Sequence, residues 1–252
     1  MYKILANTVF LGKEIIYLTE CHSTNEYAQQ LLRQKEAGEG MIIFTDKQTK
    51  GKGQRGNRWW TEPGMNLTFS LILEPRFLRS NQQFELNMVI CLSIWELLNQ
   101  YDPNFIIKWP NDILHKTHGK IAGVLIENSL QSQWMESSIV GIGLNVNQDM
   151  QIIPRALSLF NLTCETYDLW VILEKLVQRI EWNYIRLKRG EIRLLRNSYL
   201  KNLLNYQQKQ LFSDGEVFEG VIIGVGEDGK LLVDKDGSVR SYGFKEIQYL
   251  GL

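Results

Sequence analysis

The stretch FIIKWPNDILHKTHGKIAGVLIE, residues 105–127, decides the fold class because it holds three short apolar runs separated by turn signals. The turn signals are Asn-Asp at 111–112 and His-Gly at 118–119, and the runs between them have the composition of strands. A further strand is predicted over MESSIVGIGLNVN, 135–147. The sequence therefore predicts a sheet built mainly from strands that are neighbours along the chain.

Strands and helices also precede and follow this stretch. The run NLTFSLIL, 66–73, alternates apolar residues on one side, as a strand does, and MIIFT, 41–45, is expected to be a buried strand. Helices are predicted from the apolar spacing over 23–35, 83–99 and, interrupted near Gly190, 167–206. Ser23 and Glu26 fit a capping box at the start of the first helix.

The last forty or so residues have a different pattern. Short alternating runs at 216–226, 230–234 and 239–244 are joined by glycine-containing turns, which predicts a small barrel-like β unit. We therefore expect two domains, residues 1–206 and residues 207–252. A unit of this size is marginal alone and should pack on the main domain.

Composition narrows the class of protein. Twenty-eight basic and twenty-eight acidic residues cancel, so a general nucleic-acid binder is not expected, although a local cationic cluster could bind a phosphate ligand. Cys21, Cys91 and Cys164 are odd in number and widely spaced, which indicates reduced thiols. Charges interrupt the apolar runs of the N-terminus, so neither a signal peptide nor a membrane span is predicted. We expect a cytoplasmic protein.

One loop, TKGKGQRGNRWW at 49–60, carries three glycines, four cations and two tryptophans. It contains G-x-G-x-x-G, but too few residues follow it before the next strand for the crossover helix of a dinucleotide fold. A solvated hairpin connection is the plain interpretation. The adjacent Trp59 and Trp60 favour another, because their apolar area would be left in water unless a ligand covers it. The loop is therefore predicted to be a lid that orders over an anionic ligand.

Four more stretches accompany this loop in a fixed order. They are CHSTNEYA at 21–28, IKWPNDIL at 107–114, GKIAGVLIE at 119–127 and VGIGLNVN at 140–147. Together they resemble biotin protein ligases over about residues 20–160. The resemblance implies an α+β fold, with a mixed central sheet and flanking helices as in class II aminoacyl-tRNA synthetases, plus a C-terminal SH3-like domain.

The resemblance also implies an activity. Members of the family join biotin to ATP as biotinyl-5′-adenylate, with Mg²⁺, and transfer biotin to a lysine of the carboxyl carrier protein of acetyl-CoA carboxylase. Only about twenty residues precede Ser23, so the short form without an N-terminal DNA-binding domain is expected, with no nucleic-acid partner and no membrane partner. A homodimer is left open.

Site residues follow from the family motifs. The implied biotin-binding residues are Ser23, Thr24, Asn25, Gln48, Gly51, Lys52, Gly53, Gln54, Lys120, Gly123, Gly141 and Gly143. The implied ATP-binding residues are Lys52, Arg55, Arg58, Trp59, Lys108, Asn111, Asp112 and Asn145. Lys120 and Arg55 are the expected catalytic residues, and Asp112 is expected to hold Mg²⁺ directly or through water. Residues 154–160, PRALSLF, resemble the segment that covers adenine in the family.

Taken alone, several of these residues have plainer roles. Ser23 is an ordinary helix N-cap. Asn111 and Asp112 suit an Asx turn, and Lys120 suits a solvated strand start. Lys108 is harder to explain in this way, because a cation inside FIIKWP needs a partner or a phosphate.

The loop departs from the family pattern G-R-G-R-R-G-R. Lys52, Gln54 and Asn57 replace three arginines, which removes planar forks that bind phosphate. A binding-only pseudoenzyme is therefore one alternative. A lipoate protein ligase, which shares the fold and the adenylate chemistry, is another, although Ser-Thr-Asn together with K-W-P-N-D favours biotin.

Overall fold

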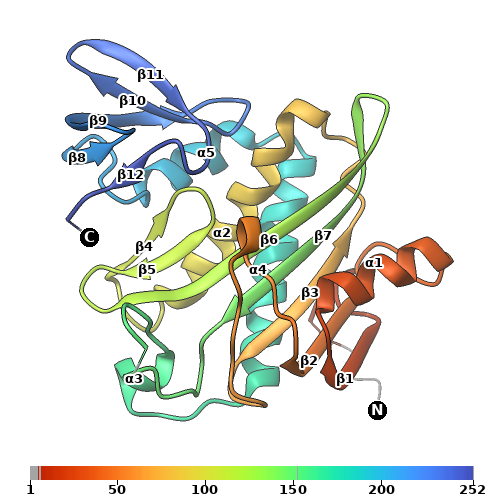
Figure 1. Cartoon of the computed structure of the whole chain (residues 1–252). Coiled ribbons are helices and arrows are strands. Elements are labelled where there is room, and N and C mark those ends of the chain that lie inside the picture. The colour runs from red at the N-terminus through yellow and green to blue at the C-terminus, as the bar shows by residue number, and fades with distance from the viewer. Residues whose placement is uncertain (1–4, 6, 152, 252) are drawn as a thin grey trace.

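A seven-stranded mixed sheet forms the centre of the computed structural model, which describes residues 5, 7–151 and 153–251 (Figure 1). In spatial order its strands are β1 (Ile15–Cys21), β2 (Ile42–Gln48), β3 (Leu67–Leu73), β7 (Trp134–Leu144), β6 (Gly119–Gln131), β5 (Asp112–His115) and β4 (Phe105–Lys108). Only β1 and β2 are parallel. The other pairs are antiparallel, and β4 to β7 follow one another in the sheet. The predicted α+β fold and its sheet of sequence neighbours are confirmed.

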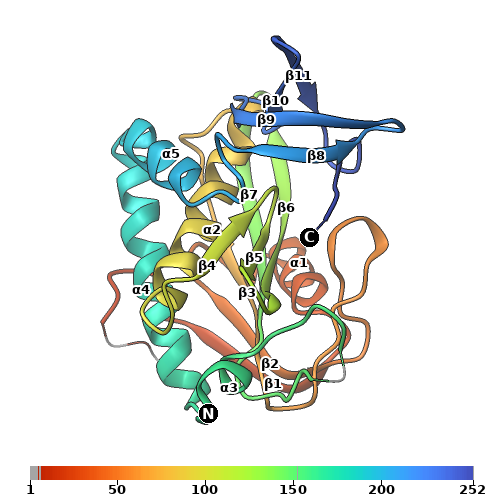
Figure 2. The same cartoon turned by 90° about the vertical axis from the view of Figure 1, so that its left-hand side faces the viewer.

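Helices cover both faces of this sheet (Figure 2). The helices are α1 (Thr24–Gln34), α2 (Gln83–Leu98), α3 (Leu159–Thr163), α4 (Leu169–Lys188) and α5 (Ile192–Lys201), with 3₁₀ turns η1 (Gln54–Gly56) and η2 (Ser80–Gln82). α2, α4 and α5 lie on one side, and α1 lies on the other side beside the loop 49–60. As a result, every residue of β3 is buried, and its polar side chains lie in the interior rather than in water.

The predicted helices are present, but the predicted capping box is wrong. Ser23 occupies the N-cap position of α1 and its side chain makes no capping hydrogen bond. Instead Gln48 of β2 accepts a hydrogen bond from the backbone N–H of Thr24, at 2.8 Å. Glu26 pairs with Lys52 of the loop at 2.5 Å. Both partners lie outside the helix, on β2 and in the loop 49–60, so tertiary contacts have replaced the local motif.

The C-terminal segment forms a second, antiparallel sheet. Its strands, in spatial order, are β11 (Ser238–Tyr242), β10 (Leu231–Lys235), β9 (Val217–Val225), β8 (Lys209–Ser213) and β12 (Gln248–Tyr249). The sheet packs on the main body through Trp109, whose indole N–H donates to the backbone oxygen of Gly229 at 2.9 Å. Within the described part of the chain, no helix is long and apolar enough to cross a membrane.

Candidate active site

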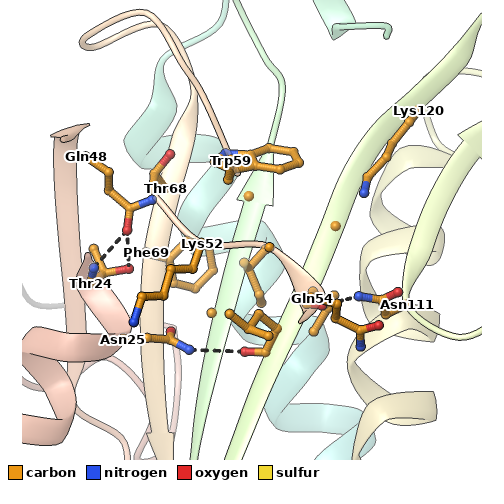
Figure 3. A pocket seen from close by; sticks show the side chains of 17 residues that line it. Thr24, Asn25, Gln48, Lys52, Gln54, Trp59, Thr68, Phe69, Asn111 and Lys120 are labelled. Carbon is orange, nitrogen blue, oxygen red and sulfur yellow. Dashed lines mark hydrogen bonds between the residues drawn. The ribbon is translucent and has the colours of Figure 1, made fainter. Parts of the chain in front are cut away.

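A polar cavity of about 50 Å³ lies between α1, the loop 49–60 and strands β3, β6 and β7 (Figure 3). It is lined by Thr24, Asn25, Gln48, Lys52, Gly53, Gln54, Trp59, Thr68, Phe69, Asn111, Lys120, Gly123, Val124, Leu125, Gly141, Ile142 and Gly143. Most residues that the sequence assigns to biotin therefore meet at one place, although they come from five segments of the chain.

The Ser-Thr-Asn segment forms one wall of this cavity through a hydrogen-bonded chain. The Ser70 hydroxyl donates to Oδ1 of Asn25 at 2.6 Å and lies 2.7 Å from the Thr24 hydroxyl. The Asn25 amide donates to Glu127 at 2.7 Å, and Gln48 binds Thr24 (Figure 3). All of these groups are fixed by their neighbours, so this wall is preorganised for a ligand that both donates and accepts hydrogen bonds.

The glycine-rich loop is itself a small hairpin. The backbone N–H of Trp59 donates to Gly51 at 3.0 Å, that of Gly53 donates to Asn57 at 2.7 Å, and η1 forms the turn. A Cβ on Gly51 would overlap the backbone oxygen of Trp59, so only glycine permits this crossing. The pair formed by Lys52 and Glu26 ties the hairpin to α1. This ion pair raises the pKa of Lys52 and lowers that of Glu26.

Trp59 and Trp60 have different surroundings, whereas the sequence treated them as one lid. Trp60 is 62% exposed. The indole of Trp59 lies inside, on the backbone of Gly143, where a Cβ would be 2.6 Å from Nε1 of the indole. Gly123 pairs with Gly143 in the sheet. The surface formed by Gly123 and Gly143, two of the glycines that the family resemblance assigns to biotin, is therefore covered by a tryptophan ring.

Three buried polar atoms at this cavity have no hydrogen-bond partner among the described residues. They are Oε1 of Gln54, Nε1 of Trp59 and Oγ1 of Thr68. Buried polar groups are normally satisfied, so their clustering marks the place where a polar ligand would bind. The sequence analysis missed Thr68 and Ser70. The available signal was two small polar residues on the second side of an otherwise apolar strand.

Lys120 lies at the edge of this cavity and also lines a neighbouring one. Its ammonium binds Asp112 at 2.6 Å and lies 5.7 Å from the centre of a Trp59 ring. It also lines a second cavity, of about 540 Å³, together with Lys108, Lys116 and Arg155. The closed polar pocket and a strongly cationic space therefore meet at one lysine.

Lys108, the cation within the predicted strand FIIKWP, lines this second cavity. Burial lowers the pKa of Lys108, an effect that the charge of Asp112 partly opposes. Lys108 also lies 5.3 Å from the ring centre of Tyr249 in the C-terminal sheet. A half-buried ammonium of this kind is suited to an anionic ligand.

The remaining predicted residues are less directly placed. The side chain of Asn145 donates to the backbone oxygen of Leu157 at 2.9 Å and so holds the segment that was predicted to cover adenine. Ser23 is buried, and Arg58 is exposed. The side chain of Arg55 lies outside the part of the chain that the structure describes. No group of three or more His, Cys, Asp or Glu residues in the described part could hold a metal ion.

A polar pocket under a glycine-rich loop shares Lys120 with a cationic cavity. This arrangement is suited to a ligase that joins two anionic substrates. The sequence profile of the biotin/lipoate A/B protein ligase family matches residues 17–145, and the chain belongs to this family.

Individual relatives agree with this assignment. The bifunctional ligase/repressor BirA of Bacillus subtilis is 28% identical over 250 residues, which cover 96% of this chain and 75% of that protein. BirA of Escherichia coli is 26% identical, with 94% and 74% covered. Among solved structures, biotin protein ligase from Aquifex aeolicus in complex with biotin and ATP superposes with a TM-score of 0.76 at 28% identity. That match covers 93% of this chain and 97% of the other.

Proposed function

We propose that this chain activates biotin with ATP to biotinyl-5′-adenylate and transfers the biotinyl group to a lysine of a biotin carboxyl carrier protein. The observation that carries the proposal is the position of Lys120, which lines both the polar pocket and the cationic cavity. A carboxylate bound in the first space and a phosphate bound in the second would meet at its ammonium. The similar structure of biotin protein ligase from Aquifex aeolicus, in complex with biotin and ATP, supports the same assignment.

The chain's main task in the first step is to offset repulsion between two anions. The biotin carboxylate attacks the α-phosphorus of ATP, and pyrophosphate leaves. Lys120 neutralises the negative charge that builds on the transferring oxygens. Lys108 binds the polyphosphate, and the polar wall of Thr24 and Asn25 holds the ureido ring. In the second step the carrier amine attacks the acyl carbon, and AMP leaves.

Biotin can enter only if Trp59 moves. The cavity volume of about 50 Å³ is smaller than the cavity of about 150 Å³ that admits benzene in another protein. The pair of Lys52 and Glu26 is exposed at both ends, so it costs little to open. If the Trp59 indole moved away from Gly143 to admit biotin and then covered the bound ligand, it would keep water from the adenylate.

Magnesium is the usual partner of ATP, and the donor set suits it. Mg²⁺ prefers one or two carboxylates together with phosphate oxygens and water, rather than a cage of protein ligands. Asp112 offers one carboxylate in the cationic cavity, so it would hold the ion directly or through water. When bound, the ion would neutralise part of the polyphosphate charge.

We also propose that residues 1–206 form the catalytic domain and residues 207–252 an SH3-like domain. The antiparallel sheet β8 to β12 supports the second unit. The absence of a nucleic-acid partner belongs to the same proposal, and analytical ultracentrifugation would decide between a monomer and a homodimer.

An incorporation assay tests the activity. Purified protein with labelled biotin, MgATP and a carrier domain should give labelled carrier, and lysine-to-arginine carrier should stay unlabelled. Incorporation of lipoate instead of biotin would reassign the chain to lipoate transfer. Biotin binding without turnover would establish a pseudoenzyme.

A second function, repression, is suggested by the bifunctional names of two relatives. A gel shift with operator-containing DNA distinguishes it. We expect no discrete retarded band at physiological salt, because the sequence has equal numbers of acidic and basic residues.

The pH dependence of kcat/KM for ATP should follow the protonation of the Lys108 amine. Burial lowers the pKa of this lysine, and a lysine is a cation only below its pKa. We therefore expect kcat/KM for ATP to fall as pH rises, beginning below the usual lysine pKa of about 10.4.

Lys108→Arg should lack this alkaline decline, because a guanidinium stays protonated to about pH 12 or beyond. Lys116→Arg is the matched control and should retain it. An alkaline decline that is identical in wild type and Lys108→Arg would assign it to another group.

A further inference from the structure

Lys108 depends on a residue that no motif identifies. Its ammonium lies over the ring of Tyr249 in β12, within the distance of about 6 Å at which an aromatic face attracts a cation. The carboxylate of Asp112, which lines the same cavity, is paired with Lys120 instead. Among the described residues no ion pair joins Lys108 to a carboxylate. The ring of Tyr249 is therefore a favourable contact for this cation.

Tyr249 makes its contacts through its ring rather than through its hydroxyl. Its ring packs edge-on against Phe212, with centroids 5.3 Å apart. Its phenol oxygen is buried, with no hydrogen-bond partner among the described residues. The contact with Phe212 orients the Tyr249 ring, and one face of this ring is turned toward the Lys108 ammonium.

The C-terminal sheet also holds the residue next to Lys108. The indole of Trp109 donates to the backbone of Gly229, at the turn between β9 and β10, and packs against Phe244 with centroids 6.4 Å apart. On the other side, Ile107 exchanges backbone hydrogen bonds of 2.8 Å with the segment that leads to this sheet, through Asn202 and Leu204. Three consecutive residues at the end of β4 thus contact either the second sheet or the segment that leads to it.

A cavity of about 650 Å³ lies at this junction. Lys108 and Asp112 line it from the main sheet, and Lys245 and Tyr249 line it from the C-terminal sheet. Figure 1 shows β12 beside β4. Two lysines face this space, and it adjoins the cationic cavity through Lys108 and Asp112, so its chemistry suits a polyphosphate.

We infer that Tyr249 is a positioning residue for the nucleotide: its ring holds the Lys108 ammonium toward the polyphosphate, and the C-terminal sheet forms one wall of the nucleotide site. The inference rests on the proposed function, since it requires that ATP be the second substrate.

Steady-state kinetics of biotin-dependent pyrophosphate exchange test this role in the full-length chain. Tyr249→Leu removes the aromatic face, and we expect KM for ATP to rise about fivefold, in the range that a cation–π contact supports. The kcat and the KM for biotin should change less than twofold. Tyr249→Phe keeps the face and should restore the wild-type KM.

Phe218→Leu is the matched control. The Phe218 ring lies 4.1 Å from the ammonium of Lys235 in the same sheet, so this variant removes a similar contact away from the site. It should lower thermal stability and leave KM for ATP unchanged. If Tyr249→Leu does not fold, pentafluorophenylalanine at position 249 keeps the ring shape, removes its negative face and should give the same rise in KM.

A double-mutant cycle separates this role from general packing. In a Lys108→Met background, Tyr249→Leu should have no further effect on KM for ATP, because the cation is already absent. Unchanged KM in Tyr249→Leu or in the fluorinated variant, or an equal rise in both backgrounds, overturns the inference. Failure of the proposed function is distinguishable, because the wild type itself would then show no biotin-dependent exchange.

Discussion

Replacing Lys120 with alanine is expected to reduce biotinyl-adenylate formation by about 10²- to 10³-fold, equivalent to about 3 to 4 kcal/mol of transition-state stabilisation. Lys120 is the residue through which the polar pocket and the cationic cavity are connected. Without its ammonium, the incoming carboxylate and the α-phosphate repel one another with no fixed cation between them. Release of pyrophosphate, followed in a single turnover with biotin and MgATP, measures this step.

The control is Lys188→Ala, which removes an exposed lysine at the end of α4 that lines neither cavity and should leave the rate within twofold. Thermal melting checks the fold. Lys120→Ala also releases Asp112 from its 2.6 Å ion pair, and Lys120→Ala/Asp112→Asn removes that unpaired charge without restoring the rate. An initial rate near that of wild type in Lys120→Ala would exclude Lys120 from catalysis.

The strands that could be predicted are those with local signals. Runs 105–115, 119–127 and 135–144 are separated by turns and pair with their sequence neighbours, so alternation and turn residues are enough to place them. β1 was missed because it pairs in parallel with β2 across the whole of α1. β12 was missed because it is only two residues long and pairs with β8, the first strand of the C-terminal sheet along the chain, rather than with β11, which precedes it. Such pairings depend on tertiary packing, which no local window records.

The residues of the candidate site could be predicted from family motifs, but their contacts in three dimensions could not. Gln48 was assigned to biotin, but it also completes the first turn of α1 by accepting from Thr24. Trp59 was assigned to an outer lid, but its ring lies on the glycine surface. In both cases the residue was identified and its contact was not, because the partner lies on an element distant in sequence, α1 for Gln48 and β7 for Trp59.

Lys52 has a partner within the protein. Lys52 replaces an arginine of the family pattern, and Glu26 of α1 receives it at 2.5 Å. Lysine is a point charge that a single carboxylate can satisfy, whereas an arginine fork is better matched to phosphate. In this structure Lys52 therefore holds the loop against α1. Gln54, with its buried unpaired oxygen, remains free to contact a ligand donor.

Replacing Gly141 with alanine is expected to weaken biotin binding about 100-fold. A Cβ at this position would overlap Oδ1 of Asn25 and lie 3.1 Å from its Cγ. Asn25 cannot yield easily, because Ser70 donates to that oxygen at 2.6 Å and Glu127 accepts from its amide at 2.7 Å. Moving the side chain breaks both bonds, each contributing about 1 to 3 kcal/mol when a buried partner is left unpaired. The wall that recognises the ureido ring is then lost.

Isothermal titration calorimetry with biotin measures this effect, and thermal melting shows whether the sheet survives. Gly224→Ala in β9 is the matched control, because the nearest atom to its added Cβ is Cδ1 of Leu232 at 3.9 Å, so its Kd should equal that of wild type. The Asn25→Ala/Gly141→Ala double variant adds a sharper comparison. It has room for the methyl group but no carboxamide, so it should bind biotin as weakly as Asn25→Ala alone. If Gly141→Ala alone bound biotin with wild-type Kd, the Asn25 wall would not form part of the biotin site.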